Sequence, residues 1–231
     1  MNFTFGLITD GREDHLLRKS ILSILAENIP DFEIIVVGNT MLTTNLKNLR
    51  IIPFDETKKN GWITRKKNLI TQFSSKNFIV FCHSYIYFCP GWYSAYIRFN
   101  EDFDICMNRI LNYDGTRFRD WLLWWENFHP LDKLLASRKA LIPYAERDLV
   151  GFMYISGSYW VAKTTTMLEH PLNERLGIGE GEDVEWSKRV RTRVKYLMNE
   201  RAAVRCMRQK EVVACEPTTE ELAEYRKVVG L

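Results

Sequence analysis

The sequence predicts an α/β protein with a central mixed, mostly parallel sheet flanked by helices. Strand, helix, strand, strand, helix and strand patterns follow one another in the first 82 residues, the order typical of a doubly wound sheet. Two of the strand patterns, at 32–37 and 77–82, are nearly continuous apolar runs, as expected for strands buried on both faces. The strand patterns end in polar or small residues at 9–11, 38–40 and 83–85, where ligands of such sheets bind.

The first half of the chain supplies regular elements. Apolar alternation predicts strands, and apolar residues recurring every three or four positions predict amphipathic helices. The predicted elements are a strand at 2–9, a helix at 12–28, strands at 32–37 and 50–54, a helix at 62–73 and a strand at 77–82.

The second half is less regular, but the whole chain is predicted to be one domain. A nucleotide-binding half at 1–100 precedes an acceptor-binding and catalytic half at 101–210 and a C-terminal helix at 211–231. Its predicted elements are a helix opening at Pro90-Gly91-Trp92, strands at 103–107, 154–162 and 202–207, a helix carrying Trp186, Val190, Val194 and Leu197 on one face, and a helix at 220–229.

Composition limits the possible classes of protein. The 231 residues are 46% hydrophobic, contain no apolar run long enough to span a membrane and begin with a strand pattern instead of a signal peptide. Five cysteines without a CxxC pair favour reduced thiols. We therefore expect a soluble, cytoplasmic protein.

Charge is unevenly spread along the chain. The total is +3, but residues 187–210 hold nine Lys or Arg and one Glu, a local +8. This stretch lacks the interleaved aromatics of a single-strand nucleic-acid platform, so no nucleic-acid partner is expected. Peripheral contact with an anionic membrane is one interpretation of the stretch, and a solvated helix face followed by a strand edge is the other.

An acidic, glycine-rich stretch at 177–189 stands out. Glu182 and Asp183 stand where its loop enters a predicted helix, and the positive end of a helix dipole favours acids there. Its glycines let the backbone pass close to a bulky ligand. The simpler interpretation is an acidic helix start with a flexible lead-in. Neither GxGxxG after the first strand nor GxxxxGK[ST] occurs, which argues against dinucleotide-binding and P-loop proteins.

Taken in order, these pieces resemble family 2 glycosyltransferases and their relatives with the GT-A fold, the Rossmann-like fold of nucleotide-diphospho-sugar transferases. The resemblance covers roughly residues 3–200 and is most specific at 179–189, which looks like the family's Glu-Asp catalytic motif. It is also carried by Thr9-Asp10, Val36-Val37-Gly38-Asn39-Thr40, Arg65-Lys66-Lys67-Asn68 and Ile155-Ser156-Gly157.

The resemblance implies an enzyme that moves a sugar, hexosyl or deoxyhexosyl, from a UDP-, GDP- or dTDP-linked donor to a hydroxyl of a glycan, glycoprotein or lipid-linked acceptor. Asp183 is then the general base and Glu182 braces the acceptor or the loop. A single base with a clamp for the leaving diphosphate predicts inversion. The implied donor-binding residues are Thr9, Asp10, Asn39, Lys67, Asn68, His83, Ser84 and Tyr85, and the implied acceptor-binding residues are Gly157, Trp160 and Trp121.

One departure concerns the metal. The slot of the family's Asp-x-Asp motif holds His83-Ser84-Tyr85, which has no carboxylate. The resemblance implies a divalent cation, Mn²⁺ or Mg²⁺, and His83 is the candidate ligand because Mn²⁺ tolerates nitrogen. Alternatively, Lys66, Lys67 or the basic stretch after Asp183 meets the diphosphate charge.

Simpler interpretations stand beside these roles. Asp10 and Asn39 are also ordinary turn residues, and Lys67 is also an ordinary solvated helix lysine. Trp121 and Trp160, together with Trp124 and Trp125, suit core or surface packing as well as sugar stacking. His15, His129 and His170 are expected to be structural.

Two further functions compete with the enzyme. A GT-A scaffold without metal carboxylates can serve as a nucleotide- or glycan-binding module, although such a module has no need of the Glu182-Asp183 pair. A sugar-nucleotide-forming nucleotidyltransferase needs a glycine-rich, basic loop after the first strand, which 9–13 does not supply.

Overall fold

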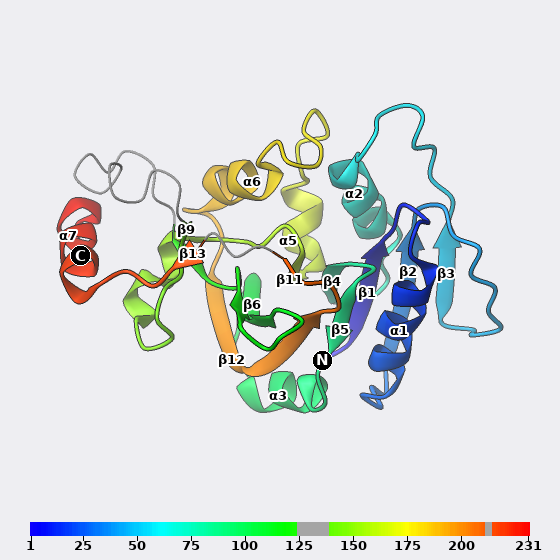
Figure 1. Cartoon of the computed structure of the whole chain (residues 1–231), viewed down its shortest axis with the longest axis horizontal. Helices are drawn as coiled ribbons and strands as arrows, with labels where there is room; N and C mark the ends of the chain where they lie inside the picture. Colours follow the sequence, from blue (N-terminus) through cyan, green and yellow to red (C-terminus); the bar gives the residue numbers. More distant parts are fainter. Residues whose placement is uncertain (124–138, 211–213) are drawn as a thin grey trace.

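The protein was analysed as a computed structural model that describes residues 1–123, 139–210 and 214–231. The described chain forms a nine-stranded sheet between two layers of helices, with the C-terminal helix at the far end (Figure 1). This is the α/β architecture that the sequence predicts.

The first half of the sheet is parallel. Its strands lie in the order β3-β2-β1-β4, so that the carboxyl ends of β1, β2 and β4 meet at one edge. The elements of this half are β1 (Phe3–Ile8), α1 (Asp14–Leu25), β2 (Phe32–Val37), β3 (Leu49–Ile52), α2 (Ile63–Phe73) and β4 (Phe78–His83). Each predicted element of this half is confirmed with shifts of a few residues at its ends.

The second half makes the sheet mixed. Strand β11 (Tyr159–Lys163) lies antiparallel between β4 and β6 (Ile105–Leu111), and β12 (Tyr196–Cys206) runs parallel to β6. The remaining strands are β5 (Ile86–Phe88) beside β12, β7 (Arg117–Phe118) beside β6, and the small pairs β8 (Leu122–Leu123) with β10 (Met153–Tyr154) and β9 (Lys139–Ala140) with β13 (Ala214–Cys215).

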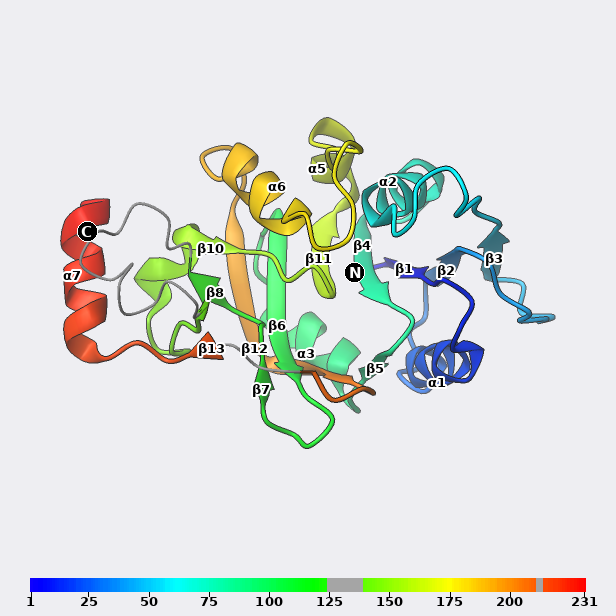
Figure 2. The ribbon, with the colours of Figure 1, turned by 45° about the horizontal axis from the view of Figure 1, so that its top comes forward.

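Helices cover both faces of the sheet. Figure 2 shows α2, α5 (Thr164–Glu169) and α6 (Glu182–Val190) on one side, and α1 and α3 (Trp92–Phe99) on the other. Gly6 in β1 allows α2 to pack closely, because a Cβ there would lie 2.4 Å from Cγ2 of Ile70. At the far end, α7 (Thr219–Val229) is joined to the 3₁₀ helix η1 (Arg147–Phe152) by Arg226 and Asp148, whose Nε and Oδ2 atoms are 2.7 Å apart.

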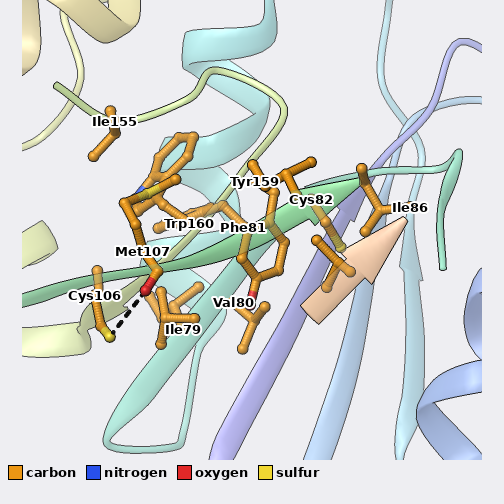
Figure 3. Packing of buried hydrophobic residues seen from close by; sticks show 14 of the residues in the cluster. Ile79, Val80, Phe81, Cys82, Ile86, Cys106, Met107, Ile155, Tyr159 and Trp160 are labelled. Atoms are coloured by element: carbon orange, nitrogen blue, oxygen red, sulfur yellow. Dashed lines mark hydrogen bonds between the residues drawn. The ribbon is translucent and has the colours of Figure 1, made fainter. Parts of the chain in front are cut away.

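The core is continuous beneath the edge where the strands end. Strands β4 and β11 pair side by side, and Figure 3 shows the side chains of Phe81 and Trp160 next to each other. The centroids of these two rings are 4.7 Å apart. Strand β4 is thereby fixed against β11, which places the residues that follow β4 next to those that precede β11.

Two predicted elements differ from the structure. The stretch 154–162 forms two strands, β10 and β11, because the chain turns between Ser156 and Tyr159. The helix after the acidic loop ends at Val190 and does not reach Leu197, which lies in β12 and pairs with Cys106 of β6. Strand pairing in the sheet overrides the helical spacing of Leu197, and Val194 lies between α6 and β12.

Candidate active site

Six of the predicted donor-binding residues line one cavity of about 520 Å³ at the carboxyl edge of the sheet. They come from the ends of β1, β2 and β4: Thr9, Asp10, Asn39, His83, Ser84 and Tyr85. Lys66 of α2 closes its floor, since its Nζ donates to the Thr9 carbonyl at 2.7 Å and to Glu56. This space is called the donor cavity below.

A second cavity of about 350 Å³ holds the predicted acids. It is lined by Glu182 and Asp183 from the start of α6 and by Gly157 from the turn before β11. His83, Tyr85, Lys210, Ile63 and Ile178 line both cavities, which therefore adjoin. This second space is called the acid cavity below.

Asp183 is held by backbone donors and still faces the acid cavity. Its Oδ2 accepts a hydrogen bond from Gly157 N at 3.0 Å, and its Oδ1 accepts one from Val184 N at 2.9 Å. The residue lies in the first turn of α6 and is partly exposed. Each oxygen keeps a lone pair, so the carboxylate is oriented and can accept a proton from a hydroxyl in the cavity.

Glu182 has a different environment. It is 6% exposed, and its Oε1 lies 3.7 Å from Nζ of Lys67, which is itself 1% exposed. Burial is the main cause that raises the pKa of Glu182, the Asp183 charge raises it further, and Lys67 opposes both. Glu182 is thus a braced carboxyl group, and Asp183 is the member of the pair that is open to the cavity.

Lys67 supports this arrangement from below. Its Nζ donates to the Gly157 carbonyl at 2.9 Å and lies 4.4 Å from the ring centroid of Trp160. Burial lowers the pKa of Lys67, and Glu182 and Asp183 oppose that shift. Since Gly157 is bound by Lys67 through its carbonyl and by Asp183 through its amide, Lys67 fixes the turn that orients the base.

Lys67 and Asn68 do not line the donor cavity, which argues against the donor-binding role implied for them. Asn68 Nδ2 donates to the Leu172 carbonyl and to Glu174, both at 2.9 Å, and its Oδ1 accepts from Leu172 N at 3.0 Å. Arg65 also binds Glu174, at 2.9 Å. The motif at 65–68 therefore anchors the segment that leads into the acidic loop.

The predicted acceptor tryptophans are in the core. Trp121 and Trp160 are both 0% exposed, so neither offers a ring face to a ligand, and the predicted sugar stacking is not supported by their placement. Gly157, the third predicted acceptor residue, does line the acid cavity. Trp124, Trp125 and His129 lie outside the described residues.

The end of β4 does not fit a divalent cation. Burial, with Lys67 and Lys210 nearby, holds the pKa of His83 well below its usual range, and Ser84 and Tyr85 offer only hydroxyl groups. Within 1–123, 139–210 and 214–231, no three His, Cys, Asp or Glu residues are grouped as a metal site requires. Of the two acids of the donor cavity, Glu56 binds Lys66, and Asp10 lies at the exposed rim, where it accepts a hydrogen bond from Arg12 N.

Three further basic residues at the cavities were not named individually from the sequence, although two of them belong to the basic stretch 187–210. Arg208 and Lys210 follow β12 and line the donor cavity, and Arg119 lines the acid cavity. The Nε of Arg119 is buried and has no hydrogen-bond partner among the described residues. The sequence signal for Arg208 and Lys210 is the basic stretch 187–210, and the signal for Arg119 is the aromatic-basic segment 117–121. Neither pattern shows which of these side chains faces a cavity.

The basic stretch 187–210 extends over the end of α6, the turn after it, β12 and the segment that follows β12. Lys188 and Arg189 are exposed on α6, Arg201 and Arg205 are exposed on β12, and Lys210 turns to the cavities. In the described part of the chain, no helix is long and apolar enough to cross a membrane.

Comparison with solved structures defines the class of fold. No protein-family model matches the sequence, and no significantly similar curated protein is found. The chain is similar to S. aureus TarS 1–349, with 14% identity over 89% of this chain and 60% of that chain and a TM-score of 0.62. The complex of TarS 1–349 with UDP-GlcNAc matches with 13% identity over 92% of this chain and 60% of that chain and a TM-score of 0.61.

GalNAc-T7, solved with UDP, GalNAc and Mn²⁺, is a third match. It shares 12% identity over 100% of this chain and 48% of that chain, with a TM-score of 0.62. This chain therefore spans about half to three fifths of the length of these three chains. Identities of 12–14% establish the fold, and the chain has the GT-A fold predicted from its sequence.

Proposed function

We propose that the protein is a glycosyltransferase that moves a sugar from a nucleotide-diphosphate donor to an acceptor hydroxyl. The observation that carries this proposal is the position of Asp183, an oriented and accessible carboxylate in a cavity that adjoins the donor cavity. A binding module would need the donor cavity but no such base. The similarity to TarS structures with UDP and UDP-GlcNAc, and to GalNAc-T7 with UDP and GalNAc, favours a UDP-linked donor.

The proposed reaction is a single displacement at the anomeric carbon. The acceptor hydroxyl, in the acid cavity, gives its proton to Asp183 as its oxygen bonds to the anomeric carbon. The bond from that carbon to the β-phosphate oxygen breaks, and its electron pair leaves with the nucleoside diphosphate. Because Glu182 is buried and paired with Lys67, it supports the loop and is not a second catalytic carboxylate. One accessible carboxylate supports inversion at the anomeric carbon.

The donor's nucleoside is proposed to bind at the ends of β1 and β2. Asp10 and Asn39 are exposed there, at the rim of the donor cavity, and Thr9 and Ser84 lie deeper. Polar side chains at such strand ends suit the base and ribose of a nucleotide. The acceptor, a glycan, glycoprotein or lipid-linked sugar, is proposed to enter on the side of Gly157.

A screen of nucleotide sugars tests the proposal. UDP-, GDP- and dTDP-linked sugars are mixed with the protein, and thermal unfolding and release of the nucleoside diphosphate are both recorded. A true donor raises the unfolding temperature by mass action and is slowly hydrolysed or transferred. Stabilisation by a donor with neither hydrolysis nor transfer to any acceptor supports the binding module instead.

A further inference from the structure

Lys210 lies at the junction of the two cavities and has no carboxylate partner in the part of the chain that the structure describes. Its Nζ donates to the Tyr85 hydroxyl and lies 4.1 Å from the centroid of the Tyr85 ring. Arg208 lies over the same ring, with its Cζ 4.9 Å from the centroid. Among the described residues, Arg208 pairs with Glu13, whereas no acid lies within ion-pair distance of Lys210. Two cations thus contact Tyr85, which lies at the positions where the resembled family has its Asp-x-Asp motif.

The segment that carries these cations is held in place. The buried side chain of Asn112 binds the backbone of Lys210 twice, accepting from its amide at 2.9 Å and donating to its carbonyl at 2.7 Å. Just before it, Met207 N donates to the Tyr85 carbonyl at 2.8 Å. Backbone contacts before and after Arg208 therefore hold Lys210 against Tyr85, so the position of Lys210 is preorganised.

The charges around the cavities are separated. The donor cavity is lined by four basic residues and two acids, a net charge of +2, and Lys210 lies on its border with the acid cavity that holds Glu182 and Asp183. A diphosphate that links a nucleoside to a sugar carries two negative charges. The sign of the charge in the donor cavity matches such a group.

We propose that Lys210, assisted by Arg208, binds the diphosphate of the donor in the place of the divalent cation that an Asp-x-Asp motif would hold. The ligand's identity rests on the proposed glycosyl transfer. When the bond between the anomeric carbon and the β-phosphate oxygen breaks, that oxygen receives the electron pair and the ammonium group donates a hydrogen bond to it. The acceptor's proton goes to Asp183, so the step needs no other reactant.

Binding of inorganic pyrophosphate in EDTA tests this inference without the sugar-transfer reaction. Isothermal titration calorimetry compares the wild type with Lys210→Met, Arg208→Met and the matched control Arg205→Met, which removes an exposed cation of β12 outside both cavities. The wild type is expected to bind in EDTA. Lys210→Met should weaken binding about 10- to 100-fold, because a hydrogen bond to a charged group is lost, and Arg205→Met should bind as the wild type does.

Two more variants keep the test decisive. Lys210→Arg preserves the charge and should retain most of the affinity, and Arg208→Met, which alters an exposed side chain, should weaken binding by a smaller factor than Lys210→Met. Thermal unfolding of each variant checks the fold. Equal affinity of Lys210→Met and wild type, or wild-type binding that requires added Mn²⁺ or Mg²⁺, overturns the inference.

The outcomes separate this inference from the proposed function. Pyrophosphate binding that depends on Lys210, in a protein that transfers no sugar, supports the diphosphate site and removes the transferase. Sugar transfer that is indifferent to Lys210→Met and abolished by EDTA keeps the transferase and removes the diphosphate site.

Discussion

Gly157 offers the sharpest test of the geometry around the base. Its amide binds Asp183 and its carbonyl binds Lys67, so it has acids on one side and a lysine on the other. A methyl group on its Cα would lie 2.9 Å from Oε1 of Glu182 and 3.1 Å from Oδ2 of Asp183. Both oxygens would have to move by a few tenths of an ångström or more to reach ordinary contact distances.

Gly157→Ala is therefore expected to displace the base while the fold survives. A misplacement of about 1 Å in a reacting group can cost about 100-fold in rate, so kcat/KM should fall about 10- to 100-fold. The backbone of Gly157 does not need the left-handed region, and alanine itself stabilises a compatible site by about 0.4–1 kcal/mol. The free energy of unfolding should thus change by no more than about 1 kcal/mol.

The assay is the initial rate of nucleoside diphosphate release over a range of donor concentrations, which gives kcat/KM, beside urea unfolding monitored by circular dichroism. Gly151→Ala is the matched control, since a methyl group at Gly151 meets no atom within 4 Å, and its activity should equal that of the wild type. Full activity of Gly157→Ala refutes the assignment of the turn and the Asp183 carboxylate to the reaction. Unfolding of the variant would instead show that the turn supports the whole fold.

Three other variants test the residues that support the base and the proposed diphosphate site. Lys67→Met leaves Glu182 buried without its partner and should lower the free energy of unfolding by about 3–5 kcal/mol at pH 8. The loss of the lysine raises the pKa of Glu182 further, so the folded protein keeps a proton that the unfolded chain releases. Urea unfolding of Lys67→Met should therefore show a free energy of unfolding that falls as pH rises from about 5 to 8. A loss of stability that does not depend on pH contradicts this account. Asn68→Ala should lower the free energy of unfolding by about 1–3 kcal/mol, because it leaves the polar backbone groups of Leu172 unpaired. Its affinity for the donor, measured by calorimetry, should not change. A fully stable Asn68→Ala variant with lost donor affinity would restore a donor-binding role for Asn68. Burial lowers the pKa of Lys210 to about 8, so calorimetry in EDTA should show that the affinity of the wild type for diphosphate falls above pH 8. The affinity of Lys210→Arg should not fall in this range, because its guanidinium stays charged. Parallel pH profiles of the two proteins would contradict the role of Lys210.

The groups that face Lys210 support this pH prediction. Burial raises the pKa of the Cys206 thiol to about 11 and raises the pKa of the Tyr85 hydroxyl as well, so both stay neutral between pH 7 and 9. The positive charges of Arg208 and Arg119 lower the pKa of Lys210 further. Lys210 is thus the residue expected to titrate there.

The parallel half of the sheet could be predicted because its signals are local. Strands such as 32–37 are apolar at nearly every position, and in a doubly wound sheet the polar residues that follow them must meet at one edge. Six of the eight predicted donor-binding residues line one cavity for this reason. The placement of Glu182 and Asp183 at the start of α6 followed in the same way from the glycines before them.

The remaining features depend on contacts that a chain pattern does not contain. Leu197 fits a helix by spacing and becomes part of β12 only because β6 is free to pair with it. Lys67 and Asn68 resemble ligand residues, but their targets, Gly157 and Leu172, lie some 90 and 104 positions away. Lys210 reaches Tyr85 across 125 positions, so its place beside the cavity emerges only in the folded structure.

The most direct test of the central claim is sugar transfer by Asp183→Asn, measured with the affinity for the donor in the same preparation. If Asp183 is the general base, transfer falls about 10²- to 10⁴-fold while donor affinity and unfolding temperature stay at wild-type values. Full turnover by Asp183→Asn contradicts the claim, as does a loss of donor affinity that by itself accounts for the loss of transfer.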